Sequence, residues 1–125
     1  MTKQLIQNAI QTPDGTILNS VNRHDYSNYL DANKELYFVD GGLEYIRKSQ
    51  NKIEAISLEL YDNEKFDILR TKFIWGTYGK TGKDEFKWIK LSEMTNEHIQ
   101  AIIDTQKNIG TLRLNIFKNE IIFTK

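Results

Sequence analysis

Asp25-Tyr26-Ser27-Asn28-Tyr29-Leu30-Asp31-Ala32-Asn33-Lys34-Glu35-Leu36-Tyr37-Phe38-Val39 is the segment from which the fold can be read most directly. Two runs rich in aromatic and apolar residues flank the polar turn Asp31–Lys34. Aromatic and β-branched residues pack well on a pleated surface, and polar residues between two such runs are typical of a hairpin turn. The segment therefore predicts a β-hairpin.

Upstream of this hairpin the sequence predicts a second one. The apolar residues of 4–12 are spaced in a way that also suits a helix face, but the β-branched residues and the turn Pro13-Asp14-Gly15 favour a strand. Thr16-Ile17-Leu18 then indicates a short returning strand.

Downstream, the hairpin is followed by Asp40-Gly41-Gly42, a signal for a sharp turn. Asp40 is a candidate helix cap, and the spacing in residues 43–48 predicts a short helix. The alternation in residues 52–60 predicts a strand.

The second half of the sequence predicts further helices. One begins at Asp62-Asn63-Glu64 and ends near Trp75-Gly76, where glycine is a typical helix stop. A short strand follows around residues 86–89, and a capped helix begins at Thr95. The tail from Leu112 fits a strand or a helix, and we favour the helix. We expect an α+β fold, a small antiparallel sheet of hairpins packed with two to four helices, as one domain over residues 1–125.

Composition narrows the class of protein. The chain has 125 residues, no cysteine, and equal numbers of basic and acidic residues, 17 of each. Without cysteine there are no disulfides, and small secreted domains usually depend on them. A zero net charge disfavours binding to extended nucleic acid, because that affinity comes largely from neutralising phosphates. No stretch approaches the ~18 apolar residues that a membrane span needs, and the first residues lack a signal-peptide pattern, so we expect a cytoplasmic protein.

Catalytic and metal-binding patterns are weak. His24 and His98 lie in different segments without the spacing of a zinc motif, so no metal site is expected. No serine stands in a glycine-flanked nucleophile turn. Gly79-Lys80-Thr81 resembles the end of a phosphate-binding loop, but the earlier glycine is replaced by Ile74. We expect neither an enzyme nor a cofactor.

A set of side chains remains that suits a charged aromatic ligand. Arg23, Arg47 and Arg113 can each bind phosphate through two parallel hydrogen bonds. Aromatic residues gather between positions 75 and 88, beside several lysines, and this combination suits a stacked nucleobase. The aromatic residues are Trp75, Tyr78, Phe86 and Trp88, and the lysines are Lys80, Lys83, Lys87 and Lys90. The alternative is that the aromatic residues pack in the core and the lysines are solvated.

Four blocks carry a resemblance to a known family. They are Arg23-His24-Asp25-Tyr26, the block from Val39 to Arg47, Trp75-Gly76-Thr77-Tyr78-Gly79-Lys80 and the block from Leu91 to Ile102. In this order the chain resembles the Thoeris anti-defence sponge proteins of phages and prophages. The resemblance implies an oligomeric protein in the host cytoplasm. It would sequester cyclic ADP-ribose isomers made by TIR-domain enzymes without cleaving them, with ligand at a protomer interface; some members also bind cyclic oligonucleotides.

The resemblance and the residue inventory together suggest a set of ligand-binding residues. They are Arg23, Tyr26, Arg47, Trp75, Tyr78, Phe86, Asn96 and Arg113. In this hypothesis Arg23 and Arg113 hold phosphates, Phe86 or Trp75 stacks on adenine, and Asn96 binds a polar edge of the ligand. A homodimer or higher homo-oligomer is expected. The alternatives are a phage inhibitor that acts on a host protein through an interface, and an enzyme that consumes a nucleotide signal.

Overall fold

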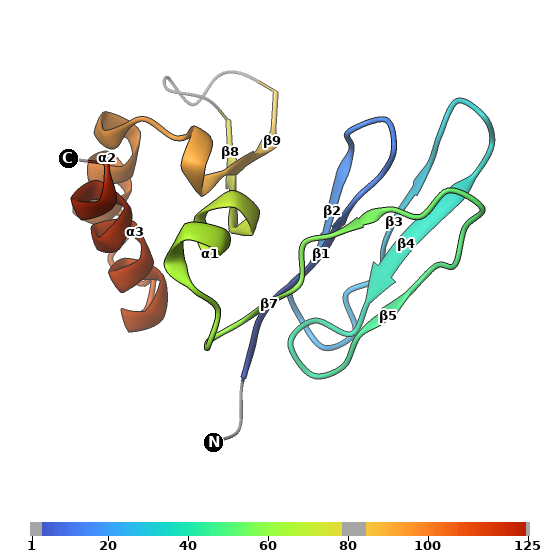
Figure 1. The fold of residues 1–125 in the computed structure, drawn as a ribbon, viewed down its shortest axis with the longest axis horizontal. Coiled ribbons are helices and arrows are strands. Elements are labelled where there is room, and N and C mark those ends of the chain that lie inside the picture. The colour runs from blue at the N-terminus through green and yellow to red at the C-terminus, as the bar shows by residue number, and fades with distance from the viewer. Residues whose placement is uncertain (1–3, 79–84, 125) are drawn as a thin grey trace. The chain divides into compact units, whose positions relative to one another are not determined.

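The computed structural model describes residues 4–78 and 85–124, and it divides into two compact units (Figure 1). The first unit is Met1–Leu69 and the second is Arg70–Lys125. Small antiparallel sheets and three α-helices make up the described part of the chain, so the expected α+β class is confirmed. The expectation of one domain over the whole chain stays a prediction.

The first unit contains two small antiparallel sheets. In one, β1 (Leu5–Gln11) pairs with β2 (Ile17–Ser20), β6 (Ile56–Ser57) and β7 (Leu60–Tyr61). In the other, β4 (Leu36–Asp40) lies between β3 (Ser27–Leu30) and β5 (Arg47–Lys48). The two predicted hairpins are thus confirmed, whereas the strand predicted over residues 52–60 is reduced to the two-residue pieces β6 and β7.

The core of the first unit lies between these sheets. Ile10 and Leu18 from the β1–β2 hairpin pack against Tyr37 and Val39 from β4, and all four are buried. Successive side chains of a strand point to opposite faces, so Phe38, between two buried residues, belongs to the outer face of the three-stranded sheet.

The helix predicted over residues 43–48 is wrong. Those residues form a turn followed by β5, which pairs with β4. Gly41 and Gly42 have φ of 100° and 56°, and Asp40 does not cap a helix. Its carboxylate instead accepts hydrogen bonds from the backbone N–H of Gly41 and from the guanidinium of Arg47.

Asn8 fixes this turn from the neighbouring sheet. Its Nδ2 donates to the carbonyl oxygens of Asp40 and Gly42, each at 2.9 Å, and to that of Tyr45 at 3.4 Å. Ser20 accepts a hydrogen bond from the N–H of Gly42 at 2.8 Å. Side chains from another part of the chain therefore hydrogen-bond the backbone of residues 40–45. The helical spacing of residues 43–48 does not determine their structure.

The second unit combines a two-stranded sheet with helices. It contains β8 (Ile74–Thr77), β9 (Lys87–Lys90), a 3₁₀ turn (Leu91–Glu93), α2 (Asn96–Thr105) and α3 (Thr111–Phe123), while α1 (Phe66–Lys72) spans the boundary between the units. Its buried residues include Phe73, Ile74, Leu91, Met94, Ile99, Ile102, Ile116 and Phe117.

The helix predictions for this half are confirmed at α2 and α3, but the helix predicted to begin at Asp62-Asn63-Glu64 starts only at Phe66, after a turn at residues 62–64. Thr95 caps α2 by accepting from the N–H of His98 at 3.1 Å, and the tail is the helix α3. The helix expected to end near Gly76 ends at Lys72, because residues 74–77 pair with β9. No helix in the part of the chain that the structure describes is long and apolar enough to cross a membrane.

Candidate ligand-binding surfaces

An exposed aromatic cluster forms on the β8–β9 hairpin. The ring centroids of Tyr78 and Phe86 are 5.2 Å apart, and those of Phe86 and Trp88 are 5.1 Å apart. Tyr78 is 58% exposed and Phe86 47%, although large aromatic side chains usually bury most of their surface. We call Tyr78, Phe86 and Trp88 the aromatic cluster.

Gly76 makes the cluster possible. It pairs with Trp88 across the hairpin, and a Cβ built on Gly76 would lie 2.6 Å from the Phe86 ring and 3.1 Å from the ring of Trp88. Because glycine has no side chain, the Phe86 ring can lie over β8 at this position. The result is an aromatic surface open to solvent.

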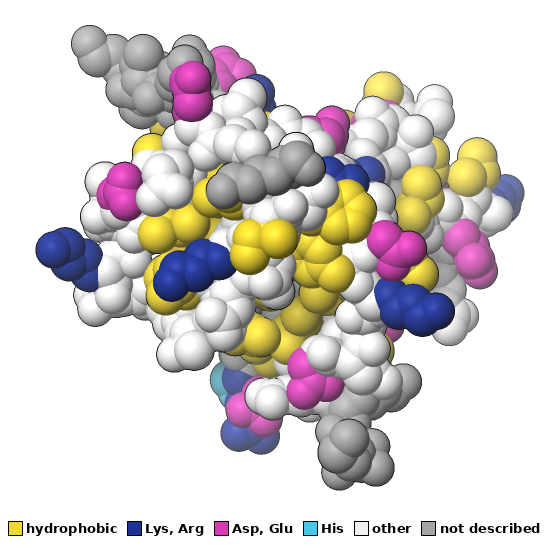
Figure 2. All heavy atoms as spheres, turned by 60° about the vertical axis from the view of Figure 1, so that its left-hand side comes forward, with side chains coloured by type: hydrophobic (Ala, Val, Ile, Leu, Met, Phe, Trp, Pro, Cys, Tyr) yellow, Lys and Arg dark blue, Asp and Glu magenta, His cyan; other side chains and the backbone are white. Residues whose placement is uncertain are grey.

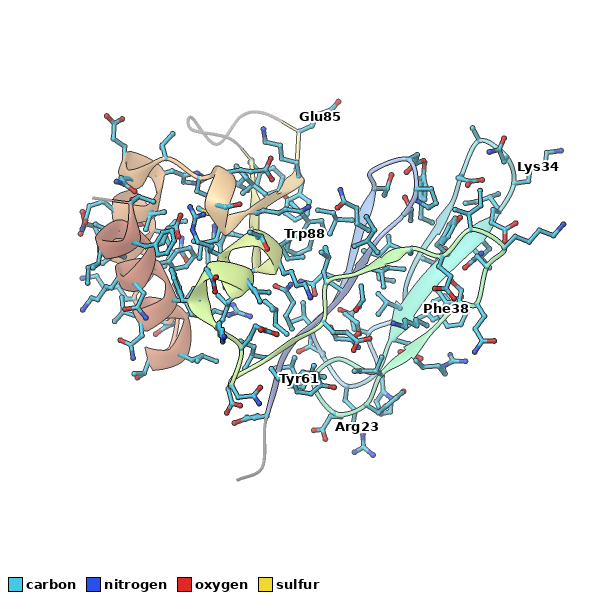
Figure 3. All side chains as sticks on the ribbon, in the orientation of Figure 1. Arg23, Lys34, Phe38, Tyr61, Glu85 and Trp88 are labelled. Atoms are coloured by element: carbon cyan, nitrogen blue, oxygen red, sulfur yellow. The ribbon has the colours of Figure 1, made fainter. Side chains whose placement is uncertain are left out.

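The charges near the cluster are mixed. Lys87 is exposed and Lys90 half-buried on the same strand, and Glu85 is exposed just before it (Figure 3). Lys80 and Lys83, which the sequence placed beside the aromatic residues, lie outside the described residues, as does most of the glycine-rich loop.

Trp75 does not join this cluster. It precedes Gly76 on β8, so its side chain points to the opposite face of the hairpin. There its ring packs edge-on against Phe117 of α3, with centroids 5.3 Å apart, and the residue is half-buried. Its contacts are those of a packing residue.

Two other predicted residues, Tyr26 and Arg47, meet at Phe38 in the first unit. Tyr26 and Phe38 have ring centroids 5.3 Å apart, and the Arg47 guanidinium lies 5.2 Å from the Phe38 ring centroid. Arg47 is also paired with the buried Asp40, with Nη2 at 3.0 Å and Nε at 3.3 Å from Oδ2. This ion pair orients the Arg47 guanidinium. It also neutralises part of the positive charge that would otherwise attract a phosphate.

Arg23 lies on the loop that precedes β3 and is labelled in Figure 3. The loop is held by Ser20, which donates to the Asp25 carbonyl, and by the Asp25 carboxylate, which accepts from the N–H of Val21. Its backbone also packs against Gly42, where an added Cβ would come within 2.9 Å of the Arg23 nitrogen. Arg23 is exposed and makes no ion pair with the residues that the structure describes, so it is available to an anion.

Asn96 and Arg113 lie on the helices of the second unit. Asn96 begins α2 and accepts a hydrogen bond from the Thr124 hydroxyl at 3.1 Å. It lines a hollow of about 470 Å³ that also includes Glu93, Glu97 and His98. The carboxylates of Glu93 and Glu97 can accept hydrogen bonds from a donor such as an exocyclic amino group, whereas they would repel a phosphate. Arg113 is exposed on the first turn of α3.

The structure thus forms two groupings among the predicted residues, Tyr78 with Phe86, and Tyr26 with Arg47. Sequence reasoning missed Phe38 and the role of Gly76, and it named Trp88 without assigning it to the site. Phe38 could have been found from the alternation of the strand, since its neighbours Tyr37 and Val39 face the core.

No group of three His, Cys, Asp or Glu side chains that could hold a metal ion occurs in residues 4–78 and 85–124. His24 belongs to the first unit and His98 to the second. No family model matches the chain, and the searches of curated proteins and of solved structures also give no match.

Proposed function

We propose that this chain is a phage or prophage anti-defence protein that binds a cyclic ADP-ribose-type nucleotide signal and sequesters it without degrading it. In the host cytoplasm this would block TIR-based immunity. The ordered blocks that resemble the Thoeris anti-defence sponge proteins motivate the proposal. Homo-oligomeric assembly is part of it.

The observation that best supports the proposal is the aromatic cluster. A nucleobase needs a flat apolar surface that is open to solvent, and stacking on one aromatic side chain contributes about 1–3 kcal/mol. Tyr78 and Phe86 are exposed, and because their rings are tilted by 51° to one another, each offers its own flat face to a base; Gly76 provides the space for the Phe86 ring. For the pyrophosphate, the exposed Arg23 is the strongest candidate, followed by Arg113, because Arg47 is already paired with Asp40.

The first experiment measures the melting temperature with and without cyclic ADP-ribose isomers, and then recovers the ligand by heating and chromatography. A ligand at 100 times its dissociation constant stabilises the folded state by about 2.7 kcal/mol, which moves the midpoint by several degrees. A shift with intact ligand supports sequestration. A shift with altered ligand would indicate an enzyme instead.

Matched variants test the site. Phe86→Ala should weaken binding by roughly 10- to 100-fold, the range that the loss of one stacked ring predicts. Tyr45→Ala removes another exposed aromatic ring, on the first unit, and should leave the affinity unchanged. Equal effects of the two variants would argue against the aromatic cluster as the base site.

A second candidate function is inhibition of a host protein through an interface. Leu43 and Tyr45 are exposed beside a hollow of about 670 Å³ that Leu5, Ile46 and Tyr61 also line. Exposed apolar residues around a groove are typical of protein-binding surfaces. The absence of any thermal shift with the nucleotides would favour this second function.

A further inference from the structure

The outward side of α3 carries an unusual stripe. Ile116, Phe117 and Glu120 are buried, so they define the side of α3 that packs against the rest of the second unit. The opposite side is exposed and includes Lys118, and beside it Leu112, Asn115, Asn119 and Ile122, all exposed, form one stripe. Leu112 is 50% exposed and Ile122 68%. Figure 2, in which the left-hand side of Figure 1 comes forward, shows hydrophobic side chains at the surface of this face, interspersed with Lys, Arg, Asp and Glu side chains.

The spacing of the stripe is that of a helix–helix seam. The four residues lie at i, i+3, i+7 and i+10, which is the a and d pattern of a heptad repeat. Such a stripe stays on one side of a helix over its whole length, here 13 residues or about 20 Å. The solvent-facing side of a surface helix is ordinarily polar along its whole length, whereas this stripe has an apolar residue at each end.

The order of the residues indicates what covers the stripe. Read in either direction, it runs apolar, Asn, Asn, apolar, and its midpoint is residue 117. A two-fold symmetric interface needs a surface that is complementary to itself, with residue i against j and j against i. Two antiparallel copies of α3 meet this condition, since Leu112 would face Ile122 of the partner subunit, and Asn115 would face Asn119 of the partner subunit.

The paired asparagines make the match chemically specific. Each side-chain amide has a donor and an acceptor, so Asn115 and the partner's Asn119 can satisfy one another when water is excluded. A polar residue at such a position fixes the register and orientation of a helix pair at some cost in affinity. The flanking Leu112 and Ile122 supply the apolar contact on either side.

We propose that two copies of this chain associate through an antiparallel contact between their α3 helices, with Leu112, Asn115, Asn119 and Ile122 as the seam. This contact would be the interface of the homo-oligomer in the proposed function. It rests on that oligomer alone and does not depend on nucleotide binding. One short helix pair is a small interface, so the dimer belongs to the weak class and forms at micromolar or higher concentrations.

The test measures the molar mass of the full chain by light scattering over a concentration series. The expected mass rises from 14.7 kDa to twice that value, 2 × 14.7 = 29.4 kDa. Ile122→Asp should give a monomer at every concentration with an unchanged circular dichroism spectrum, since the residue is exposed. A wild-type monomer up to millimolar concentration, or a dimer that persists in Ile122→Asp, would overturn the proposal.

Charge variants test the orientation. In an antiparallel seam, Asn115→Asp faces the partner's Asn119, which can donate to the new carboxylate, so the dimer persists. The double variant Asn115→Asp, Asn119→Asp opposes carboxylates and should weaken the dimer by about 100-fold or more. Loss of the dimer in Asn115→Asp alone would overturn the antiparallel arrangement, because carboxylates face each other only in a parallel pair.

Cross-linking gives an independent readout, because the natural chain has no cysteine. A mixture of Leu112→Cys and Ile122→Cys should form a mixed disulfide faster than either variant forms a disulfide with itself. Lys107→Cys, an exposed position outside α3, is the control and should react slowly. Equal rates for the three samples would contradict the seam. The ligand is not needed for any of these measurements, so their failure and the failure of nucleotide binding are separable.

Discussion

At the scale of single residues, Asp14 joins two hairpins of the first unit. Its carboxylate accepts hydrogen bonds from the Thr12 hydroxyl at 2.5 Å, the Tyr29 hydroxyl at 2.6 Å and the Thr16 N–H at 3.1 Å. These bonds, that from Thr12 foremost, lower the pKa of Asp14 well below its ordinary value of 3.8. The same carboxylate raises the pKa of the Tyr29 hydroxyl.

Asp14→Asn should therefore lower stability in a pH-dependent way. A carboxyl group with a lowered pKa stabilises the folded state above its unfolded pKa, and this contribution is lost as the pH falls through the folded pKa. The melting temperature of the variant should lie below that of the wild type at neutral pH, and the gap should narrow below about pH 4. Glu44→Gln, an exposed carboxyl without these bonds, should show no such gap.

A buried ion pair links the end of α1 to α3. Arg70 Nε and Nη2 donate to the two oxygens of Glu120 at 2.8 Å each, and the Glu120 side chain is 1% exposed. The Arg70 guanidinium also lies 4.5 Å from the ring centroid of Phe123. The hydrogen bonds with Glu120 raise the Arg70 pKa, so the arginine stays charged.

Glu120→Gln should be strongly destabilising. The change leaves a partly buried guanidinium without its carboxylate, and breaking a buried ion pair costs about 3–5 kcal/mol. Because Arg70 is partly exposed, we expect the lower end of this range. Urea denaturation followed by circular dichroism measures the loss, with the exposed Glu93→Gln as control. A loss below about 1 kcal/mol would mean that the pair contributes little.

At the scale of elements, the loop between β4 and β5 depends on a side chain from another sheet. Asn8→Ala removes the donor to the carbonyls of Asp40, Gly42 and Tyr45 and should cost about 1–3 kcal/mol. Asn8→Asp should cost more at neutral pH, because a carboxylate then faces carbonyl oxygens, and should recover in acid. Thermal denaturation of both variants tests this. Asn28→Ala, exposed on β3, is the control and should be neutral.

The β8–β9 hairpin offers a test of the aromatic cluster that does not remove an aromatic ring. Gly76→Ala places a Cβ in the space of the Phe86 ring, whose far end must move. The backbone of Gly76 is not left-handed, so stability should change by less than about 1 kcal/mol while nucleotide affinity falls.

Gly15→Ala is the reciprocal control, because Gly15 has φ of 95° at a turn of the first unit. It should lose stability and keep its affinity. Calorimetric titration with cyclic ADP-ribose isomers measures both variants. If Gly76→Ala binds as tightly as the wild type, then the position of the Phe86 ring does not matter for binding.

At the scale of the whole molecule, local patterns predicted the elements that depend on local interactions. The hairpin of residues 25–39 has its turn and both strands in one short segment, and α2 has its cap at Thr95. Where distant contacts decide, the sequence was misleading. Asn8 lies 32 to 37 residues from the carbonyls that it binds in the turn after β4, so the helical spacing of residues 43–48 had no influence.

The candidate site, too, could be predicted in its local features and not in those that depend on distant contacts. The types of residue suited to a nucleotide can be listed from the sequence, but their grouping depends on strand register. Phe38 brings Tyr26 and Arg47 together because β3 and β5 flank β4 in a fixed register. Trp75 and Phe86 separate because they lie on opposite faces of one hairpin. The face of Trp75 could not be inferred from spacing, because the helix before it was expected to run on to Gly76 and it ends at Lys72.

The division into units has a spectroscopic consequence. Both tryptophans, Trp75 and Trp88, belong to the second unit, whereas five of the six tyrosines belong to the first. Light absorbed at the red edge of the tryptophan band therefore excites the second unit alone, without any label. A ligand that stacks on the aromatic cluster should change this emission. A ligand that stabilises the protein and leaves the emission unchanged would not be stacked on the aromatic cluster.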